Sequence, residues 1–333
     1  MSRIIEKISL VNFRNYESFE LDFKKTTTLI VGENGSGKTS VIEAVYLALL
    51  GKSFRSGDDE ILREGADYYR VDLMRAKNTM TVKYDGEKRI FDVNGKKYGR
   101  LPRAERYPVV LFLPSSLNLV ASSPVSRRDY FDTILSSIDE KYHKAMLGYG
   151  RALKQRNELL KMGNALSEEL FPWNVMLAKY GIEMKKKREW LKEEINGVLS
   201  KKYKDIARKD DKCELVLNGV EMGSEEGYLR RLEDGAMQDK IMGHTRFGVH
   251  RDEWRFYFNG KIADKSASRG ETRSMVLALK FIEAEILTRE TGKKPLILLD
   301  DVFSELDEER QRNLVKNFAE NQIIITSVKG IKG

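Results

Sequence analysis

The stretch GENGSGKT, residues 32–39, constrains this chain more than any other feature. It fits G-x-x-x-x-G-K-[S/T], follows the apolar run TLIV at 28–31, and precedes a helical pattern with apolar residues at every fourth position from Val41. Glycines let backbone N–H groups approach phosphate oxygens, and the dipole of the following helix favours an anion, so this order predicts a phosphate-binding loop. The alternative is a glycine-rich turn that carries a lysine by chance. The residues that we expect at the nucleotide are Asn34, Gly35, Ser36, Gly37, Lys38, Thr39 and Ser40.

A second motif supplies carboxylates. PLILLDDVFSELDEER, residues 295–310, runs from apolar residues into Asp300 and Asp301. A buried strand that ends in carboxylates presents them where an α/β sheet binds its ligand. We therefore predict that Asp300 and the Thr39 hydroxyl hold Mg²⁺, and that Lys38 reaches the β- and γ-phosphates. Asp301 would position the attacking water. The alternative is a strand whose aspartates only cap the next helix.

A second helix start lies far from the phosphate loop, in SASRGETRSMVLALK at residues 266–280. Small polar residues precede a helical spacing of Met275, Leu279, Ile282 and Ile286. A helix start of this kind is a natural anion site. A single chain is not expected to fold this helix onto its own phosphate loop if both flank one sheet. A second copy, facing head to tail, could present it to the opposite nucleotide, and the nucleotide would then hold a dimer together.

Charge and composition narrow the class of protein. The chain has 333 residues, 59 Lys and Arg against 51 Asp and Glu, and a net charge of +8, which favours a polyanionic partner, nucleic acid first. A single cysteine, Cys213, excludes an intrachain disulfide and fits a reducing compartment. We find no apolar run of membrane-spanning length and no signal-peptide pattern at the start, so we expect a soluble cytoplasmic protein.

The order of patterns predicts one α/β nucleotide-binding fold interrupted by a helical lobe. Strand patterns dominate residues 1–122, which carry the phosphate loop and a hairpin signal at Asn94-Gly95. Long helical patterns rich in Lys, Glu and Leu fill 123–210. Strand patterns return in 211–333, with CELVLNGV, WRFYFNGKIA, LILL and IIIT. We predict a mixed sheet with flanking helices and an inserted all-helical lobe.

The order of the motifs resembles that of the ABC-type ATPases, in which an early phosphate loop is followed by a Ser-x-Gly helix start and then by two aspartates and Ser304 to Asp307. NFRNYESF at 12–19 resembles the SMC-like branch. Four longer stretches are similar to the RecF family of recombination mediators, and the resemblance covers roughly residues 3–328. These stretches are SPVSRRDYFD (123–132), YGRALKQRNELLK (149–161), FPWNVMLAKYG (171–181) and GHTRFGVHRDEW (243–254).

This resemblance implies an ATP-dependent switch. ATP and Mg²⁺ would bind the phosphate loop, Ser268 and Gly270 would complete the site of a partner copy, Arg14 would reach the nucleotide, and Asp307 would line the dimer seam. The ATP-dependent homodimer would clamp double-stranded DNA near single-strand gaps, and slow hydrolysis would release it. The family acts with RecO and RecR in loading a recombinase. No membrane partner is implied.

Several residues depart from the common ABC pattern. Arg269 and Glu271 replace Gly and Gln of the signature, and we expect Glu271 to support the helix start instead of facing phosphate. Asp301 stands where many relatives have Glu, which suits slow hydrolysis. No histidine follows the last strand, where transporters carry a sensor of the γ-phosphate, and we expect the hydroxyls of Thr326 and Ser327 to substitute for it only weakly. We assign no glutamine loop.

Three rival classes of protein follow from the same motifs. A transporter ATPase should carry the terminal histidine and the glutamine loop. An SMC-like head should carry a long coiled coil, where this chain has only a short helical segment. In a nucleotide-dependent scaffold, hydrolysis would be incidental.

The basic runs at Arg127-Arg128, 185–188 and 201–204 are hypothetical DNA contacts, with a solvated helix face as the alternative for each. His250-Arg251-Asp252 is either a link between the signature helix and the nucleotide or a structural loop.

Overall fold

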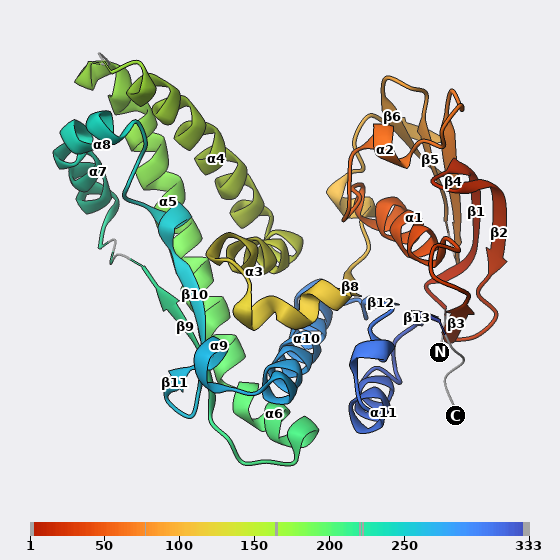
Figure 1. The fold of residues 1–333 in the computed structure, drawn as a ribbon. Helices are drawn as coiled ribbons and strands as arrows, with labels where there is room; N and C mark the ends of the chain where they lie inside the picture. The colour runs from red at the N-terminus through yellow and green to blue at the C-terminus, as the bar shows by residue number, and fades with distance from the viewer. Residues whose placement is uncertain (1–2, 77, 164–165, 220, 222, 329–333) are drawn as a thin grey trace. The chain divides into compact units, whose positions relative to one another are not determined.

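The computed structural model describes residues 3–76, 78–163, 166–219, 221 and 223–328 (Figure 1). The chain divides into two compact units, the first made of Met1–Leu117 with Glu283–Gly333 and the second of Asn118–Ile282. The first unit contains both strands and helices, and helices dominate the second. The predicted α/β class of fold is confirmed. None of the described helices is long and apolar enough to cross a membrane.

A six-stranded antiparallel sheet forms one layer of the first unit, in the order β2-β1-β4-β5-β6-β7. The predicted pairing of the first two strands is confirmed, with Leu10 opposite Phe19. The hairpin predicted at Asn94-Gly95 joins β6 to β7, and both residues have positive φ (51° and 86°), as a tight hairpin turn requires. The strands are β1 (Ile5–Phe13), β2 (Tyr16–Asp22), β4 (Tyr69–Arg75), β5 (Thr79–Tyr84), β6 (Arg89–Val93) and β7 (Lys96–Tyr98).

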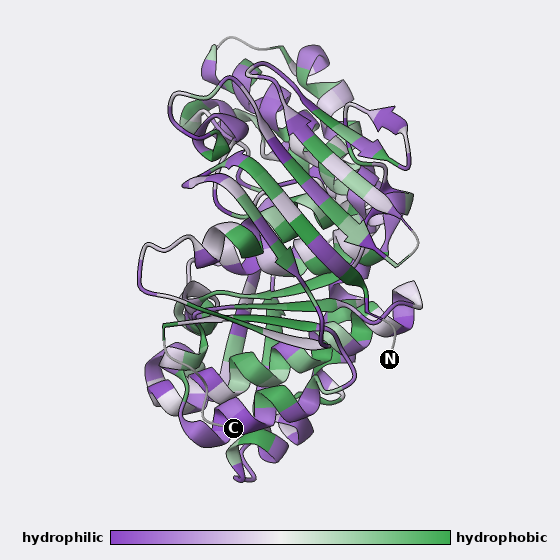
Figure 2. Ribbon diagram, turned by 90° about the vertical axis from the view of Figure 1, so that its right-hand side faces the viewer, coloured by the Kyte–Doolittle hydropathy of each residue, from purple (hydrophilic) through white to green (hydrophobic). Residues whose placement is uncertain are grey.

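A four-stranded parallel sheet forms the second layer, in the order β3-β13-β12-β8. Both central strands are buried along their whole length, and they read as continuous apolar runs, as parallel strands covered on both faces do. Figure 2 shows this sheet as largely hydrophobic, whereas hydropathy alternates along the antiparallel strands. The strands are β3 (Thr27–Val31), β8 (Val109–Phe112), β12 (Leu296–Asp300) and β13 (Ile323–Ser327).

Helix α1 (Lys38–Leu50) packs between the two sheets, in contact with β1 and β4 of one and with β12 and β13 of the other. Because it is covered on both sides, every residue from Ser40 to Leu49 is buried. The helix therefore starts at the phosphate loop and continues through the core. The other helical segments of this unit are α2 (Asp58–Ile61), η1 (Arg103–Glu105), η4 (Phe303–Glu305) and α11 (Glu308–Asn317); η2 (Pro114–Ala121) begins in it.

The second unit consists of long helices and a three-stranded antiparallel sheet, in the order β11-β10-β9. Its helical segments are α3 (Pro124–Ile138), α4 (Glu140–Lys161), α5 (Ser167–Asn196), α6 (Leu199–Ala207), α7 (Glu225–Asp234), α8 (Ala236–Met242), η3 (Val249–Arg251), α9 (Ala263–Ser266) and most of α10 (Arg269–Thr291). Its strands are β9 (Cys213–Asn218), β10 (Glu253–Phe258) and β11 (Lys261–Ile262).

The compact units divide the chain differently from the predicted segments after residue 210. Residues 211–282, which we expected to continue the ATPase lobe, belong to the second unit. The physical reason is that β9 packs on α5 and α6, while β10 packs on α3. Phe131 of α3 stacks on Trp254 of β10 with ring centroids 4.1 Å apart. The segments 1–122, 123–210 and 211–333 stay predictions about domain boundaries.

Buried arginines hold the second unit together. Arg188, with 2% of its side chain exposed, pairs with Asp132 at 2.8 Å and with Asp252 at 3.0 Å, and donates to the Val249 carbonyl oxygen. Arg127 is also buried; it donates to the Trp254 carbonyl oxygen and pairs with Glu253. Both residues belong to basic runs that were hypothetical DNA contacts. Their burial gives both arginines a structural role, whereas Lys186, in the same run as Arg188, is exposed.

Replacement of Arg188 by Met should destabilise the protein strongly. The change leaves the half-buried carboxylate of Asp132 and the buried carboxylate of Asp252 without their shared cation. Breaking a buried pair in this way costs about 3–5 kcal/mol. The free energy of unfolding, measured by urea denaturation, should fall by that amount. Lys186→Ala, in the same helix, is the control and should change it by less than about 0.5 kcal/mol. Equal stability of the two variants would show that the buried pairs do not stabilise the fold.

Candidate nucleotide site

The phosphate loop joins the end of β3 to the start of α1. Gly32 donates its N–H to the Ser327 carbonyl oxygen at 3.3 Å, which ties the loop to the end of β13. Gly35 and Gly37 have φ of 81° and 91°, a conformation that side chains with a Cβ rarely adopt. Helix geometry leaves the N–H groups of Lys38 and Thr39, at the start of α1, without an intrahelical acceptor, whereas the Ser40 N–H donates to the Gly37 carbonyl oxygen at 2.8 Å. The backbone therefore has the form that receives a phosphate group.

Tyr16, at the start of β2, supports this loop from the side. Its hydroxyl donates to the Ser36 carbonyl oxygen at 3.2 Å, and its ring lies against Gly37 so closely that a Cβ there would be 2.7 Å from ring atoms. Phe19 packs against the same ring, with centroids 4.6 Å apart. The sequence gives no spacing signal that would have singled out Tyr16, because the contact depends on how β2 folds back beside the loop.

Lys38 is nine-tenths buried at the start of α1. Its ammonium group donates to the carbonyl oxygens of Gly32 and Glu33, both at 2.7 Å, so the side chain curls back over the loop. These acceptors are neutral. Phosphate oxygens are charged acceptors of the same kind and form stronger bonds to an ammonium group. The position of Lys38 therefore fits the predicted contact with the β- and γ-phosphates.

The predicted metal ligands lie together. The Thr39 hydroxyl donates to Asp300 Oδ1 at 2.9 Å, although the two residues are 261 positions apart. Among the described residues, no group of three or more His, Cys, Asp and Glu side chains gathers to hold a metal ion. This donor set suits Mg²⁺, which keeps several waters and binds through one or two protein oxygens and the substrate's phosphates.

Thr326, at the end of β13, organises the two aspartates. Its hydroxyl donates to Asp300 Oδ1 at 2.8 Å and accepts from the Asp301 N–H at 3.0 Å. Thr326 is fully buried. We expected Thr326 only as a substitute for a phosphate-sensing histidine, but both bonds of its hydroxyl stay within the protein. The signal that would have found its organising role is its register, since it pairs with Asp300 across two parallel strands.

Asp301 has an unusual geometry. Its φ is 52°, which is uncommon for a residue with a Cβ, and strain of this kind gathers at functional sites. Its Oδ1 is a buried oxygen with no hydrogen-bond partner within the described part of the chain. A buried carboxylate oxygen without a donor is costly. A water beside the nucleotide would satisfy it, which fits the predicted role of Asp301.

The Arg14 guanidinium is hydrogen-bonded within the protein. Its guanidinium donates through Nε and Nη2 to the two carboxylate oxygens of Glu43, at 2.9 and 2.8 Å, and through Nη1 to the Glu60 carbonyl oxygen at 2.6 Å. Ser53 and Ser56 complete the group. Glu43 is a fully buried residue of α1, so the pair joins the NFRN segment to the helix that starts at the loop. The predicted contact of Arg14 with the nucleotide stays a prediction.

Ser268 and Gly270 lie at the start of α10 in the second unit, and the phosphate loop lies in the first. The Ser268 hydroxyl accepts from the Glu271 N–H at 3.3 Å, and Glu271 Oε2 accepts from the Ser268 N–H at 2.8 Å. This reciprocal arrangement is a capping box. These bonds, and to a lesser extent Lys209, lower the pKa of the Glu271 carboxyl. The expectation that Glu271 supports the helix start is confirmed.

Asp307 caps α11. Its Oδ1 accepts from the Arg310 N–H at 2.9 Å, its side chain also pairs with that of Arg310, and the residue is exposed. Exposure is what a residue at a dimer seam needs, and the cap fixes its direction. The role of Asp307 at a seam stays a prediction.

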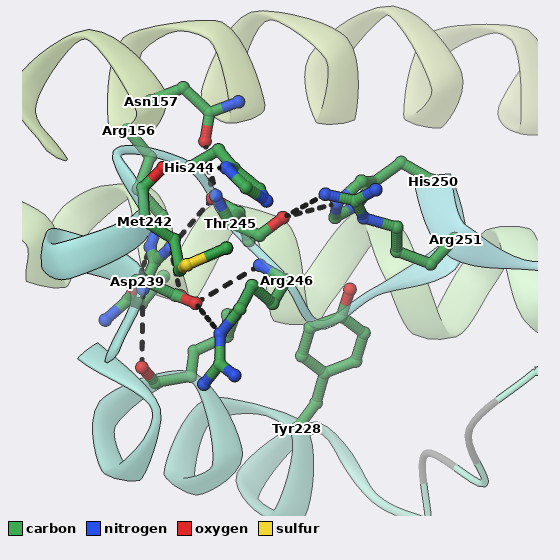
Figure 3. A network of polar contacts seen from close by, with 12 residues as sticks. Arg156, Asn157, Tyr228, Asp239, Met242, His244, Thr245, Arg246, His250 and Arg251 are labelled. Carbon is green, nitrogen blue, oxygen red and sulfur yellow. Dashed lines mark hydrogen bonds and ion pairs between the residues drawn. The ribbon is translucent and has the colours of Figure 1, made fainter. Parts of the chain in front are cut away.

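The motif GHTRFGVHRDEW forms a buried polar network in the second unit (Figure 3). Arg156, fully buried, pairs with Asp239 at 2.8 Å and donates to the Thr245 hydroxyl at 2.7 Å. His250 Nδ1 lies 2.7 Å from the Tyr149 hydroxyl, and its Nε2 lies 3.0 Å from the Thr245 carbonyl oxygen. These contacts give His250 a structural role within the second unit.

Burial lowers the pKa of His250 to about 4, and the positive charges of Arg251, Arg128 and Arg156 act in the same direction. The imidazole is therefore neutral at neutral pH. Gly248 allows the close approach in this network, because a Cβ there would lie 2.2 Å from the Tyr149 hydroxyl oxygen and its φ is 138°.

Comparisons with known proteins agree with this geometry. A family model described as an AAA domain matches residues 7–218. The fold, the loop and the paired aspartates define an ATPase head of the ABC type. Two curated relatives, both called DNA replication and repair protein RecF, come from Carboxydothermus hydrogenoformans and Ruminiclostridium cellulolyticum. They are 30% and 32% identical to this chain, over 98% and 97% of it and 95% and 92% of their own lengths.

Solved structures show the same likeness. A structure of the recombination mediator protein RecF with ATP, in the RecFOR pathway, aligns over 100% of this chain and 94% of its own length, with a TM-score of 0.89 and 29% identity. A second structure, of RecF with ATPrS, aligns with the same TM-score over 95% of its length. The chain belongs to the RecF family.

Replacement of Thr326 by Val should impair the use of Mg²⁺-ATP. The substitution keeps the shape of the side chain but removes the hydroxyl that joins Asp300 to the Asp301 backbone. Loss of a group that orients a metal ligand typically costs 10- to 100-fold in metal affinity or activity. The Mg²⁺ dependence of ATP binding and hydrolysis should shift by about this factor. Thr326→Ser keeps the hydroxyl and should retain most of the activity, and a wild-type Mg²⁺ profile for the Val variant would contradict the assignment.

The buried neutral His250 should make the protein less stable in acid. Its folded pKa of about 4 lies below the ordinary value of 6.5, so the unfolded chain takes up a proton first as the pH falls. Stability is full above pH 6.5 and is lost between 6.5 and 4, by on the order of 3 kcal/mol. Denaturant unfolding at several pH values should show this loss in the wild type and a shallower one in His250→Gln. Equal slopes would rule out a neutral buried histidine.

Proposed function

We propose that this protein is an ATP-dependent DNA-binding switch of recombinational repair. One observation carries the nucleotide part, the hydrogen bond from Thr39 to Asp300 beside the phosphate loop. It places a hydroxyl from the helix start and a carboxylate from the end of β12 at one point, as P-loop ATPases require for Mg²⁺. The ATP in the RecF structure of the same fold supports ATP as the nucleotide.

Each of the site residues of the first unit has its own role in ATP binding or hydrolysis. Backbone N–H groups of residues 34–40 bind the phosphates, and Lys38 neutralises the β- and γ-phosphates. Thr39 and Asp300 hold Mg²⁺, which, when bound, offsets the charge that develops on the phosphate oxygens. Asp301 orients the attacking water through the oxygen that has no partner within the described residues. Its side chain is one methylene shorter than the glutamate of many relatives, and this favours slow hydrolysis.

Dimerisation by ATP would make this reaction a switch. Ser268 and Gly270 would face the nucleotide of a second copy, with Asp307 at the seam and Arg14 near the phosphates after release from Glu43. ATP binding would close two copies around double-stranded DNA, and hydrolysis would open them. Ser268 is exposed at a capped helix start, which leaves this site accessible to another chain.

The biological partners follow from the family. The net charge of +8 suits a duplex bound without regard to sequence. The structural relatives are recombination mediators of the RecFOR pathway, and this supports RecR and RecO as partners in recombinase loading near single-strand gaps in the cytoplasm. A nucleotide-dependent scaffold or an SMC-like head, in which hydrolysis is incidental, is the second candidate. The short side chain of Asp301 and its positive φ favour it.

Replacement of Ser268 by Arg should block ATP-driven dimerisation. The longer charged side chain breaks the capping box and fills the helix start, while the phosphate loop is unchanged. Light scattering with ATP and Mg²⁺ should show a doubled mass for the wild type and a monomer for the variant. Direct ATP binding should be equal in both, and Lys38→Met, which weakens ATP binding, should also stay monomeric. A wild type that stays monomeric with ATP bound would overturn the switch.

A further inference from the structure

Two cations of the first unit lie at the ring of Tyr107, in the segment between η1 and β8. The Arg75 guanidinium lies 5.0 Å from the centre of the Tyr107 ring, and the Lys293 ammonium lies 5.7 Å from it. The Tyr107 hydroxyl donates to the Lys294 carbonyl oxygen at 3.1 Å, which fixes the ring. Arg106 precedes Tyr107 in the chain. We call Arg75, Arg106, Tyr107 and Lys293 the Tyr107 cluster.

The cations of this cluster lack the carboxylate partners that other cations of the first unit have. Arg14, Arg70 and Arg89 pair with Glu43, Asp72 and Asp58 at 2.7–3.0 Å. Within the described part of the chain, Arg75, Arg106 and Lys293 form no ion pair. Glu105 is near enough to act on Arg75 only at longer range, and the neighbouring Lys294 is already paired with Glu320.

Arg106 is the cation of the cluster with the fewest partners. Its Nε is buried without a hydrogen-bond partner among the described residues, and its Nη2 reaches only the Leu101 carbonyl oxygen at 3.4 Å. Burial, and then the charge of Arg103, lowers the pKa of the Arg106 guanidinium, and burial lowers that of Arg75. A partly desolvated guanidinium without a carboxylate partner destabilises a fold. Because Arg106 is only partly buried and its Nε is enclosed, an external anion would meet its terminal nitrogens.

We propose that the Tyr107 cluster is a contact surface for the phosphate groups of duplex DNA. The guanidinium groups of Arg75 and Arg106 offer N–H donors to the oxygens of a phosphodiester, and Lys293 adds an exposed point charge. Contacts of this kind need charge and donors but no base edges, which suits binding without sequence preference. The proposal rests on the proposed function, because it names the surface through which the switch holds DNA.

The test compares two double variants of the full-length protein. Arg106→Met with Lys293→Ala removes two charges from the cluster, and Lys24→Ala with Lys25→Ala removes two exposed charges between β2 and β3 of the same unit. Affinity for a fluorescent duplex is measured by anisotropy, with ATP and Mg²⁺, from 50 to 300 mM KCl. We expect the cluster variant to bind at least about tenfold more weakly near 100 mM salt. Its log–log salt slope should be smaller by about two. The control should stay close to the wild type.

The outcomes separate this proposal from the proposed function. A wild type that does not bind duplex DNA overturns the proposed function. A wild type that binds, with a cluster variant whose affinity and slope match those of the control, overturns only the surface. In a further experiment, inorganic phosphate at millimolar concentration is added to the complex with duplex DNA. Displacement of DNA by phosphate at constant ionic strength, lost in the cluster variant, would show that both bind the same cations and would support the surface. Binding of phosphate that the cluster variant loses, without displacement of DNA, would assign the cluster to a small anion and overturn the DNA surface.

A thermal scan tests whether the variants remain folded. Because Arg106 is desolvated and lacks an anion, Arg106→Met alone should leave the melting temperature unchanged or raise it, while weakening DNA binding. A lower melting temperature with unchanged binding would show that Arg106 serves the fold, and would overturn its place in the surface. ATP binding should be the same in all variants, because none of these residues belongs to the phosphate loop.

Discussion

The hydrogen bond between the Thr39 hydroxyl and the Asp300 carboxylate is the contact on which the arrangement of the first unit depends. It joins the start of α1 to the end of β12, and Thr326 extends it to β13 and to the Asp301 backbone. Each of these groups is buried or half-buried, so each bond satisfies atoms that would otherwise be costly in the interior. The same bonds that close the core also place the oxygens that suit Mg²⁺, and stability and chemistry therefore share one set of atoms.

Some cations of this protein are paired with carboxylates, and others have no such partner among the described residues. In the second unit, Arg156 and Arg188 lie in the interior with carboxylates at hydrogen-bond distance, and they act as parts of the framework. In the first unit, Glu43 plays the equivalent part for Arg14. The cations around Tyr107 lack such partners among the described residues. A positive net charge alone does not locate a binding surface, whereas the absence of compensation points to one.

The sequence was informative where local chemistry is strict. The phosphate loop, the Asn94-Gly95 hairpin and the strand that ends at Asp300 depend on spacing and glycine positions, and all were predictable. The support of α10 by Glu271 was also predictable, since a carboxylate is stable at a helix start. The contacts of Arg14 with Glu43 and of Tyr16 with Gly37 were not, because they join segments whose approach depends on the packed sheets. The basic run 185–188 misled for the same reason, since burial of Arg188 follows from the packing of α5 against α3 and η3.

The capping box at the start of α10 has a consequence for the direction of hydrogen bonding. A serine hydroxyl has one proton and two lone pairs. Because the Ser268 oxygen already accepts the Glu271 N–H through one lone pair, its proton is the group that is wholly free for an external ligand. An acceptor such as a phosphate oxygen is therefore matched, whereas a donor such as an ammonium group would compete with the helix for the same oxygen. Glu271, which departs from the usual signature, thus orients Ser268, which matches it.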